Sequence, residues 1–296
     1  MKIIITGSLG NISKPLTKEL VQKGHQVTLI SSKPEKQKNI EVLGATAAIG
    51  SLEDVNFLVE TFKRADAIYT MIPPNYYQDK NIDMRAFYNK IANNYAQAIE
   101  QSGVKRVVHL SSIGAHTDKN NGQLAAHYDA AAVLNKLDGR DITFMRPLAF
   151  YYNLNSFIPV IKNTGSISAN YGENDKVAWV SPLDIATAIT EEILTPLTGR
   201  KIRYVASDQL TCNEVATILG DAIGKPDLIW NTISDEQMQS RLERIGMTAS
   251  YAAGLVGMNA AMHSGILFED YYKNKPVLSK TKMVDFAKEF ATAYNS

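Results

Sequence analysis

Cysteine, net charge and long apolar runs are all scarce in this sequence of 296 residues. The single cysteine, Cys212, excludes an internal disulfide and leads us to expect a reducing, cytoplasmic location. Lys and Arg total 31 and Asp and Glu total 30, a formal net charge of +1, so we expect no nucleic-acid partner. No apolar run reaches membrane-spanning length, so no membrane partner is expected either.

Metal-binding patterns are missing as well. The histidines His25, His109 and His116 form no ligand set with nearby Cys, Asp or Glu, and we predict no metal site. Cys212 follows Thr211 and precedes Glu214 by two residues, which is the pattern of a helix capping box. The cysteine is therefore predicted to be structural rather than nucleophilic.

The most informative stretch runs from Lys2 to Ser13 and reads KIIITGSLGNIS. A strand of β-branched residues enters a turn with two glycines, and a helical pattern follows. Glycine permits a positive φ and a close backbone approach, and the helix N-terminus attracts an anion, so this order predicts a dinucleotide pyrophosphate site. A tight strand–helix turn with no ligand has a similar pattern, but the βαβ series that follows favours the nucleotide. The predicted contacts are Gly7, Ser8, Leu9, Gly10, Asn11 and Ile12.

Strands and helices alternate over the first half of the chain. Predicted strands are Ile3–Ile5, Val27–Ile30, Ala45–Ile49, Ala67–Ile72, Val104–Leu110 and Ile142–Met145, and predicted later helices are Glu35–Leu43, Glu53–Lys63, Asp83–Ser102 and Ala125–Leu137. Such alternation builds a parallel sheet with helices on both faces. We therefore predict an α/β, Rossmann-like, doubly wound parallel sheet.

The regular alternation of predicted strands and helices ends after Pro147. We expect residues 1–150 to form an NAD(P)-binding domain, to which residues 176–206 return with a strand, a helix and another strand. Residues 151–175 and 207–296 are expected to form a smaller, mostly helical substrate-binding region over the carboxyl ends of the sheet, where α/β proteins bind ligands.

Four motifs in this order resemble a known family. They are the turn Thr6–Asn11, the strand Val104–Leu110 followed by Ser111–Ala115, the pair Arg146–Pro147, and the stretch Trp179–Ala186. Together they resemble NmrA-like atypical short-chain dehydrogenase/reductases, nearest the NAD(P)H-dependent quinone and triphenylmethane-dye reductases. The resemblance implies an NAD(P)-binding fold with a small C-terminal substrate region, in a group that holds both reductases and redox-sensing regulators.

The residues after the second strand indicate which cofactor is bound. NAD sites usually have an acid there, which repels a 2′-phosphate. This chain has Ser31, Ser32 and Lys33, and hydroxyls with an ammonium suit a phosphate. The serines could instead cap the next helix while Lys33 is merely solvated. We expect NADP(H) rather than NAD(H).

The Tyr-x-x-x-Lys pair of better-known short-chain dehydrogenases is incomplete here. Tyr128 is the nearest candidate, but Ala132 stands where the lysine would be. His127 falls where the reductase group often has a histidine, and could orient the substrate or donate a proton. A partly buried structural histidine is the other interpretation. His127 and Tyr128 are the catalytic candidates.

The remaining site candidates follow strand ends. Met71, Ile72 and Pro73 are predicted near the cofactor, although a rigid turn alone explains the prolines. Ser111 and Pro147 are predicted near the nicotinamide. Phe150, Tyr151 and Asn153 could form a wall for a planar substrate, although aromatic residues at such positions also serve as core.

These observations lead to one functional hypothesis and one alternative. The hypothesis is an NADPH-dependent reductase that transfers hydride to a small planar electrophile such as a quinone, with a small-molecule substrate and a possible homodimer. The alternative is a non-catalytic, NAD(P)-sensing regulatory protein.

Overall fold

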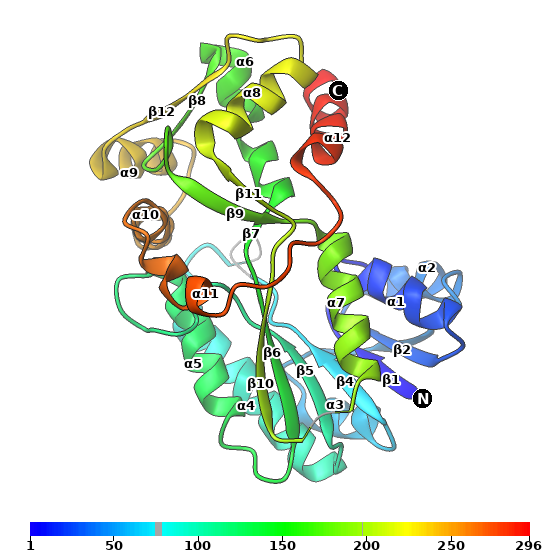
Figure 1. Ribbon diagram of the computed structural model, residues 1–296. Helices are drawn as coiled ribbons and strands as arrows, with labels where there is room; N and C mark the ends of the chain where they lie inside the picture. Colours follow the sequence, from blue (N-terminus) through cyan, green and yellow to red (C-terminus); the bar gives the residue numbers. More distant parts are fainter. Residues whose placement is uncertain (75–78, 197) are drawn as a thin grey trace.

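The protein is described by a computed structural model over residues 1–74, 79–196 and 198–296 (Figure 1). Its centre is a seven-stranded sheet in which the neighbouring strands all pair in parallel. The spatial order is β10 (Arg200–Val205), β6 (Asp141–Pro147), β5 (Arg106–Leu110), β4 (Ala67–Thr70), β1 (Lys2–Ile5), β2 (Gln26–Ser31) and β3 (Thr46–Ile49). The order reverses beside β1, which is where ligands bind in open α/β sheets.

Helices cover both faces of this sheet, as the alternating pattern predicts. In β1, Ile3 and Ile5 point to one face and Ile4 to the other, since side chains alternate along a strand. The first face packs against α1 (Ser13–Gln22), α2 (Gln37–Glu41) and α7 (Pro182–Leu194). The second packs against α3 (Val55–Phe62), α4 (Met84–Ser102) and α5 (Ala125–Leu134). The predicted doubly wound, Rossmann-like α/β class is confirmed.

The C-terminal region is mostly helical but contains two small sheets. One consists of β7 (Ala149–Phe150), β9 (Lys176–Val180) and β11 (Asp208–Thr211), and the other of β8 (Ser166–Ala169) and β12 (Ile229–Thr232). Around them lie a 3₁₀ segment η3 (Tyr151–Phe157) and the helices α6 (Ile158–Thr164), α8 (Cys212–Ala222), α9 (Asp235–Arg244), α11 (Glu269–Lys273) and α12 (Met283–Asn295).

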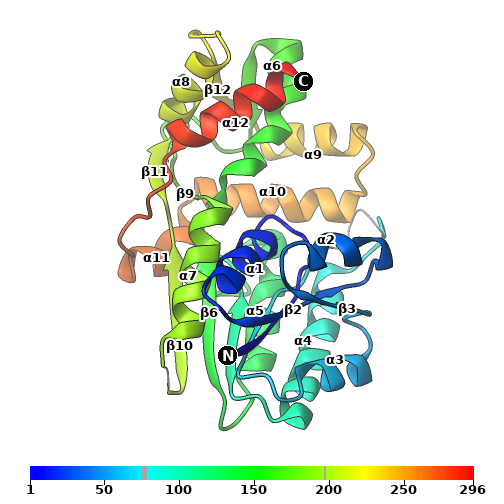
Figure 2. The ribbon, with the colours of Figure 1, turned by 90° about the vertical axis from the view of Figure 1, so that its right-hand side faces the viewer.

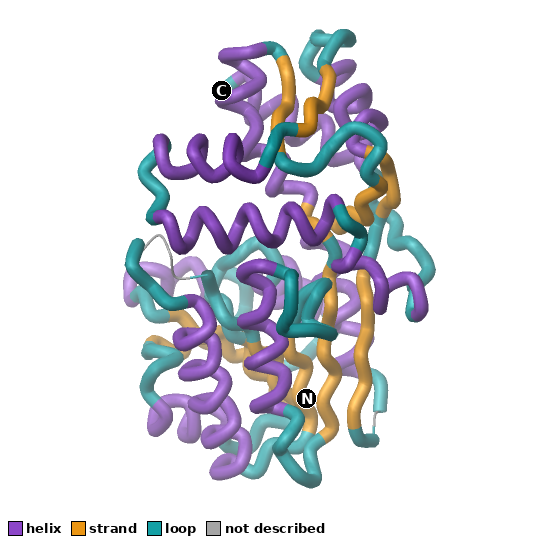
Figure 3. Tube along the Cα trace, turned by 90° about the vertical axis from the view of Figure 1, so that its left-hand side faces the viewer, coloured by secondary structure: helices purple, strands orange, loops and turns teal. Residues whose placement is uncertain are grey.

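One long helix lies between this region and the central sheet. In Figures 2 and 3, α10 (Ala249–His263) crosses the molecule just beyond the ends of the sheet strands. Its neighbours on the sheet side include η2 (Gly122–Leu124), which precedes α5. The last 3₁₀ turn, η4 (Ile266–Phe268), connects α10 to α11.

Several element ends differ from the sequence-based prediction. The strand expected at Ala67–Ile72 ends at Thr70, because the Met71 amide donates to the Thr6 hydroxyl at 2.8 Å and leaves the ladder. The helix expected to reach Leu137 ends at Leu134, where the Leu137 amide closes a tight turn at 3.2 Å on the Leu134 carbonyl. The strand expected from Val104 begins at Arg106.

No helix in the described ranges is long and apolar enough to cross a membrane.

Candidate cofactor and substrate site

The glycine turn between β1 and α1 has the conformation that its sequence predicts. Gly7 has a φ of +92°, and a Cβ there would lie 2.4 Å from the Ser13 hydroxyl oxygen. The Gly10 amide donates to the Gly7 carbonyl at 3.1 Å, and a Cβ on Gly10 would lie 3.0 Å from that oxygen. Neither position accepts a side chain without a shift, so the backbone itself forms the surface of the turn.

The N-terminus of α1 presents an uncompensated positive dipole end. This helix, all of whose residues are described, has no capping side chain and no acidic residue in its first turn. Ser13 occupies the place of a third glycine, and its hydroxyl donates to the Thr6 carbonyl at 2.8 Å within the protein. The exposed side of the turn, at Gly10 and Asn11, can therefore receive an anion.

Hydrogen bonds join this turn to the end of β2. The Ser8 hydroxyl donates to the Ser31 hydroxyl at 2.9 Å, and the Lys33 amide also donates to the Ser31 hydroxyl oxygen at 3.2 Å. Ser31 is 2% exposed, so its hydroxyl serves these contacts within the protein. Ser32 and Lys33 are exposed and lie free to meet a ligand beyond the strand.

The segment after β4 is held against the same turn. The Met71 carbonyl accepts the Tyr95 hydroxyl at 2.7 Å, and the Ile72 carbonyl accepts the Tyr88 hydroxyl at 3.3 Å. Ile72 is buried, whereas Met71 and Pro73 are partly exposed. Leu9 is partly buried and packs on the core that also contains Ile12. These contacts fix the end of β4 next to the glycine turn.

Unpartnered polar atoms gather on the segment that links β5 to α5. Buried atoms without a hydrogen-bond partner occur on six residues between positions 109 and 127: His109, Ser111, His116, Asn121, Gln123 and His127. Burial of an unpaired polar group costs about 1–3 kcal/mol, so each of these groups calls for a partner such as water or a ligand. This concentration makes the stretch from β5 to the start of α5 a candidate functional region.

The two residues predicted near the nicotinamide lie side by side at these strand ends. The Ser111 amide donates to the Met145 carbonyl at 2.8 Å, and the Ile113 amide donates to the Pro147 carbonyl at 3.0 Å. The Ser111 hydroxyl is itself one of the unpartnered atoms. The structure therefore brings Ser111 and Pro147 together at the carboxyl ends of β5 and β6, with β4 on the other side of β5.

His127 points into the protein, and Tyr128 points outward. The His127 ring meets the Tyr88 ring edge-on, with centroids 4.9 Å apart, and its Nδ1 has no partner. Burial lowers the pKa of His127 to about 4, so the imidazole is neutral at physiological pH. Tyr128 is 37% exposed, on the other side of α5.

A further histidine, His109, lies in β5 of the central sheet. It is fully buried in β5, its Nδ1 lies 2.9 Å from the Thr70 hydroxyl, and its Nε2 has no partner. Burial, with a smaller contribution from nearby His127, lowers its pKa to about 3. The sequence analysis did not select His109, because a histidine inside a strand gives no sign of such a neighbour.

The aromatic segment after β7 divides between two environments. Tyr151 is 1% exposed, stacks on Phe286 with centroids 5.5 Å apart, and donates its hydroxyl to the Thr281 carbonyl at 3.1 Å. Phe150 is partly buried and stacks on Tyr152 at 5.2 Å. Asn153 is exposed. Tyr151 thus packs against α12 and is not brought to the glycine turn.

Sequence reasoning missed Asn155. Its neighbour in η3, Tyr152, has a hydroxyl near the Asn11 side chain, which offsets part of the rise in the Tyr152 pKa that burial causes. Residues three apart share a face of a 3₁₀ helix, so Asn155 lies on the same face of η3, and its buried Oδ1 has no partner. A three-residue period in the sequence, with Tyr151 and Leu154 buried, is the signal that could have separated the two faces.

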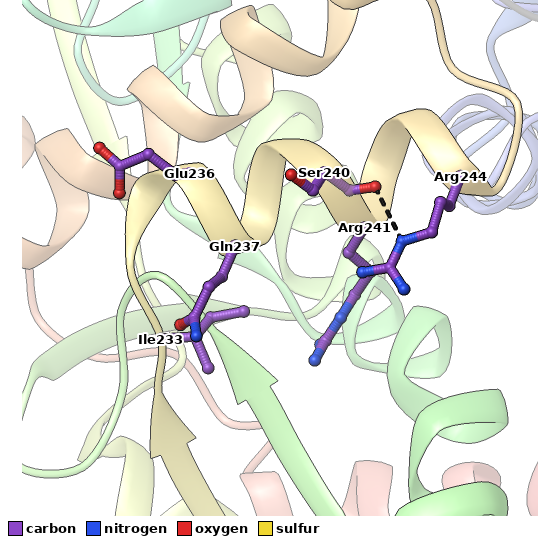
Figure 4. Close-up of a pocket in the computed structure, with 6 residues that line it drawn as sticks. All are labelled: Ile233, Glu236, Gln237, Ser240, Arg241 and Arg244. Carbon is purple, nitrogen blue, oxygen red and sulfur yellow. Dashed lines mark hydrogen bonds between the residues drawn. The ribbon is translucent and has the colours of Figure 1, made fainter.

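Two surface hollows are formed by other residues. A hollow of about 420 Å³ lies along α9, where Gln237, Arg241 and Arg244 line one face of the helix (Figure 4). Arg244 Nε donates to the Ser240 carbonyl at 3.3 Å, and Arg241 donates to the Ser168 carbonyl at 2.9 Å. None of the predicted site residues lines it. A second hollow, of about 290 Å³, lies between α4, η2 and α10.

The residues present fit a dinucleotide cofactor. The glycine turn leaves its backbone open to a pyrophosphate, and the unpartnered Ser111 hydroxyl lies where a nicotinamide would end in this topology. No group of three His, Cys, Asp or Glu side chains within the described ranges could hold a metal ion.

A comparison with protein families agrees with this geometry. The profile of the NmrA-like family matches residues 1–287. The chain belongs to the NmrA-like family. The match spans the central sheet and most of the C-terminal region, including α10 and the start of α12.

One curated relative and two solved structures are informative. The (4-alkanoyl-5-oxo-2,5-dihydrofuran-3-yl)methyl phosphate reductase of Streptomyces griseus is 23% identical over 226 residues, which cover 76% of this chain and 74% of the relative. Triphenylmethane reductase of Citrobacter sp., complexed with NADP(H), has a TM-score of 0.77 and 19% identity, over 98% of this chain and 99% of that one. The NADPH-dependent quinone oxidoreductase of Escherichia coli has a TM-score of 0.75 and 18% identity, over 97% and 99%.

Proposed function

We propose that this member of the NmrA-like family is an NADPH-dependent reductase of small, planar, uncharged electrophiles such as quinones. The observation that carries the proposal is the concentration of buried, unpartnered polar atoms at positions 109–127, next to a glycine turn that is open to a pyrophosphate. The curated relative and the two neighbouring structures are all named as reductases, which supports the same chemistry.

The preference for NADP(H) over NAD(H) is part of the proposal. No carboxylate occurs from Ser31 to Pro34, where NAD sites usually carry one. Ser32 and Lys33 are exposed at this place and could hold a 2′-phosphate with charge-assisted hydrogen bonds. Both neighbouring structures are named with NADP(H) or NADPH, in agreement with this preference.

His127 would act as a neutral hydrogen-bonding group in this reaction. Because its pKa is about 4, the ring carries no proton to spare at pH 7 and would orient a substrate carbonyl rather than act as a strong acid. The bound cofactor would supply hydride, and a solvent proton would complete the hydroquinone. A quinone accepts hydride readily, so correct positioning supplies much of the rate.

The test measures the oxidation of NADPH in the presence of a panel of quinones, triphenylmethane dyes and simple aldehydes. The loss of NADPH absorbance monitors the reaction. We expect turnover of quinones, with NADPH used in preference to NADH. Stoichiometric cofactor binding without turnover of any substrate in the panel would overturn the proposal.

A variant separates the role of His127 from that of cofactor binding. His127→Ala should lower kcat for a quinone by about tenfold or more, since it removes one oriented hydrogen bond, and leave the Kd of NADPH within about twofold. His25→Ala, in the turn before β2 and at the opposite end of the strands from the glycine turn, is the control. An unchanged kcat in His127→Ala would remove this residue from the mechanism.

A further inference from the structure

The charged side chains that line the hollow between α4, η2 and α10 already contact other groups of the protein. Asp83 caps α4 by accepting the Ala86 amide at 3.0 Å. Arg85 makes a bidentate pair with Asp129, at 2.6 and 2.7 Å. A carboxylate or phosphate ligand would have to compete with these contacts, whereas an uncharged ligand would not. The hollow of about 290 Å³ therefore suits a small neutral molecule.

Gln123 brings an unused hydrogen-bonding amide to this hollow. Its Nε2 lies 3.8 Å from the Met258 sulfur, which is a weak acceptor. Its Oε1 is buried and has no partner. A buried side-chain amide with so few hydrogen bonds lowers the stability of the protein unless a ligand supplies the missing partner.

Two neighbours relate this hollow to His127. Gln123 lies in η2, four residues before His127, at the point where the chain runs into α5. The Tyr88 ring contacts the His127 ring, and the hydroxyl of Tyr251, another residue of the hollow, is near enough to raise the pKa of Tyr88 further. These contacts connect the hollow to the proposed reaction centre.

Close backbone packing holds Gln123 in place. Gly122 has a φ of +57°, and a Cβ there would lie 2.3 Å from both the Gly254 carbonyl oxygen and the Met258 amide of α10. The backbone of η2 beside Gln123 is therefore held by direct contact with the backbone of α10.

We propose that Gln123 is a specificity-determining residue, whose amide oxygen accepts a hydrogen bond from a hydroxyl group carried by the uncharged substrate. The inference rests on the proposed reductase function for the class of substrate, a quinone, and adds the group that this quinone should carry. A quinone with a hydroxymethyl substituent should then be preferred over the same quinone with a methyl group.

The experiment compares 2-(hydroxymethyl)-1,4-benzoquinone with 2-methyl-1,4-benzoquinone as substrates of the full-length protein with NADPH. The wild type should favour the hydroxymethyl compound in kcat/KM by about tenfold, the value of one good hydrogen bond. Gln123→Met, which keeps the volume and removes the acceptor, should reduce this ratio to about one and leave the Kd of NADPH unchanged. Gln101→Met, at the far end of α4, is the matched control, and Gln123→Leu, which also removes the acceptor, replaces Gln123→Met where that variant does not fold.

Failure of this inference can be told apart from failure of the proposed function. The two corresponding hydroquinones are titrated calorimetrically into the protein saturated with NADP⁺. Absence of turnover with a retained, Gln123-dependent preference in binding would overturn the reductase function and support the role of Gln123. A preference that survives in Gln123→Met, or no preference in the wild type, would overturn the role of Gln123.

Discussion

The hydroxyl of Ser13 stabilises the glycine turn from inside the protein. It donates to the Thr6 carbonyl at 2.8 Å, while the Thr6 hydroxyl accepts the Met71 amide at 2.8 Å. The ends of β1 and β4 are thereby connected through side chains of two small residues. A third glycine would lose the first of these bonds, so serine is favoured by the structure itself rather than by the ligand.

Gly10 provides a test of the pyrophosphate site. We expect Gly10→Val to abolish measurable NADPH binding, because the new side chain would project from an exposed part of the turn 3.0 Å from the Gly7 carbonyl. The fold should survive, with circular dichroism close to that of the wild type. Calorimetric titration measures the affinity, with Thr46→Val, an exposed position at the opposite end of the strands, as the control for a β-branched substitution. Binding within threefold of the wild type would contradict the placement of the phosphates.

Lys33 provides a test of the cofactor preference. Lys33→Ala should weaken NADPH binding by about 1.5–3 kcal/mol, the range for a hydrogen bond to a charged group, and leave NADH binding nearly unchanged. Lys36→Ala, three residues further on, is the matched control. Equal losses for the two cofactors, or none for NADPH, would identify Lys33 as a solvated charge.

Residues differ in how far the sequence predicts their place. Asp83 and Gly103 mark the ends of α4 correctly, because a cap and a left-handed glycine act within one turn of the chain. Tyr151 and Tyr152 are adjacent residues of the same type, so the sequence does not distinguish them. Only the packing of η3 against α12 decides that Tyr151 is buried against Phe286. The catalytic candidates His127 and Tyr128 remain predictions for the same reason, since the residues around them come from segments that are distant in the sequence.

At the scale of elements, helices with local start signals were predicted well and short strands were not. α7 begins at Pro182 with Ser181 as its cap, and α8 begins at Cys212 with a complete capping box from Thr211 and Glu214. β8 and β12 are four residues each and exist only as partners of one another. A strand of that length has no stability without its neighbour, so its sequence alone indicates little.

The capping box of α8 can be tested through stability. Thr211→Ala should lower the free energy of unfolding by about 1 kcal/mol, because the Glu214 amide loses its side-chain acceptor. Thr217→Ala, an exposed position on the same helix, should cause no loss. Urea unfolding at pH 7.5 measures both. Equal effects of the two substitutions would mean that the cap contributes nothing beyond helix propensity.

The whole molecule should lose stability in acid because of its buried histidines. The folded-state pKa values of His109 and His127, about 3 and about 4, lie below the unfolded value of 6.5. The unfolded chain therefore binds more protons, so this contribution is complete above pH 6.5 and declines as pH falls through the interval between 6.5 and these values. Between pH 7.5 and pH 5, His109 alone should account for a loss of about 2 kcal/mol.

Urea unfolding at the two pH values checks this expectation. His109→Asn, which retains a group near the Thr70 hydroxyl but does not titrate, should show a smaller difference between pH 7.5 and pH 5 than the wild type. Between pH 7.5 and 8.5 both proteins should show no change from this source. An identical acid loss in the variant would assign the effect to other groups.

The path of the chain has a consequence for how the protein can be divided. After leaving the central sheet at β6, the chain visits the C-terminal region and then returns with α7, which covers α1, and with β10, which pairs with β6 along its whole length. A fragment ending near residue 150 would therefore keep every residue of the glycine turn and yet lose its edge strand and one covering helix. Its β6 would present open amides and carbonyls to other molecules. No single cut separates two self-sufficient halves, and exchange of the C-terminal region between relatives requires grafting several segments at once.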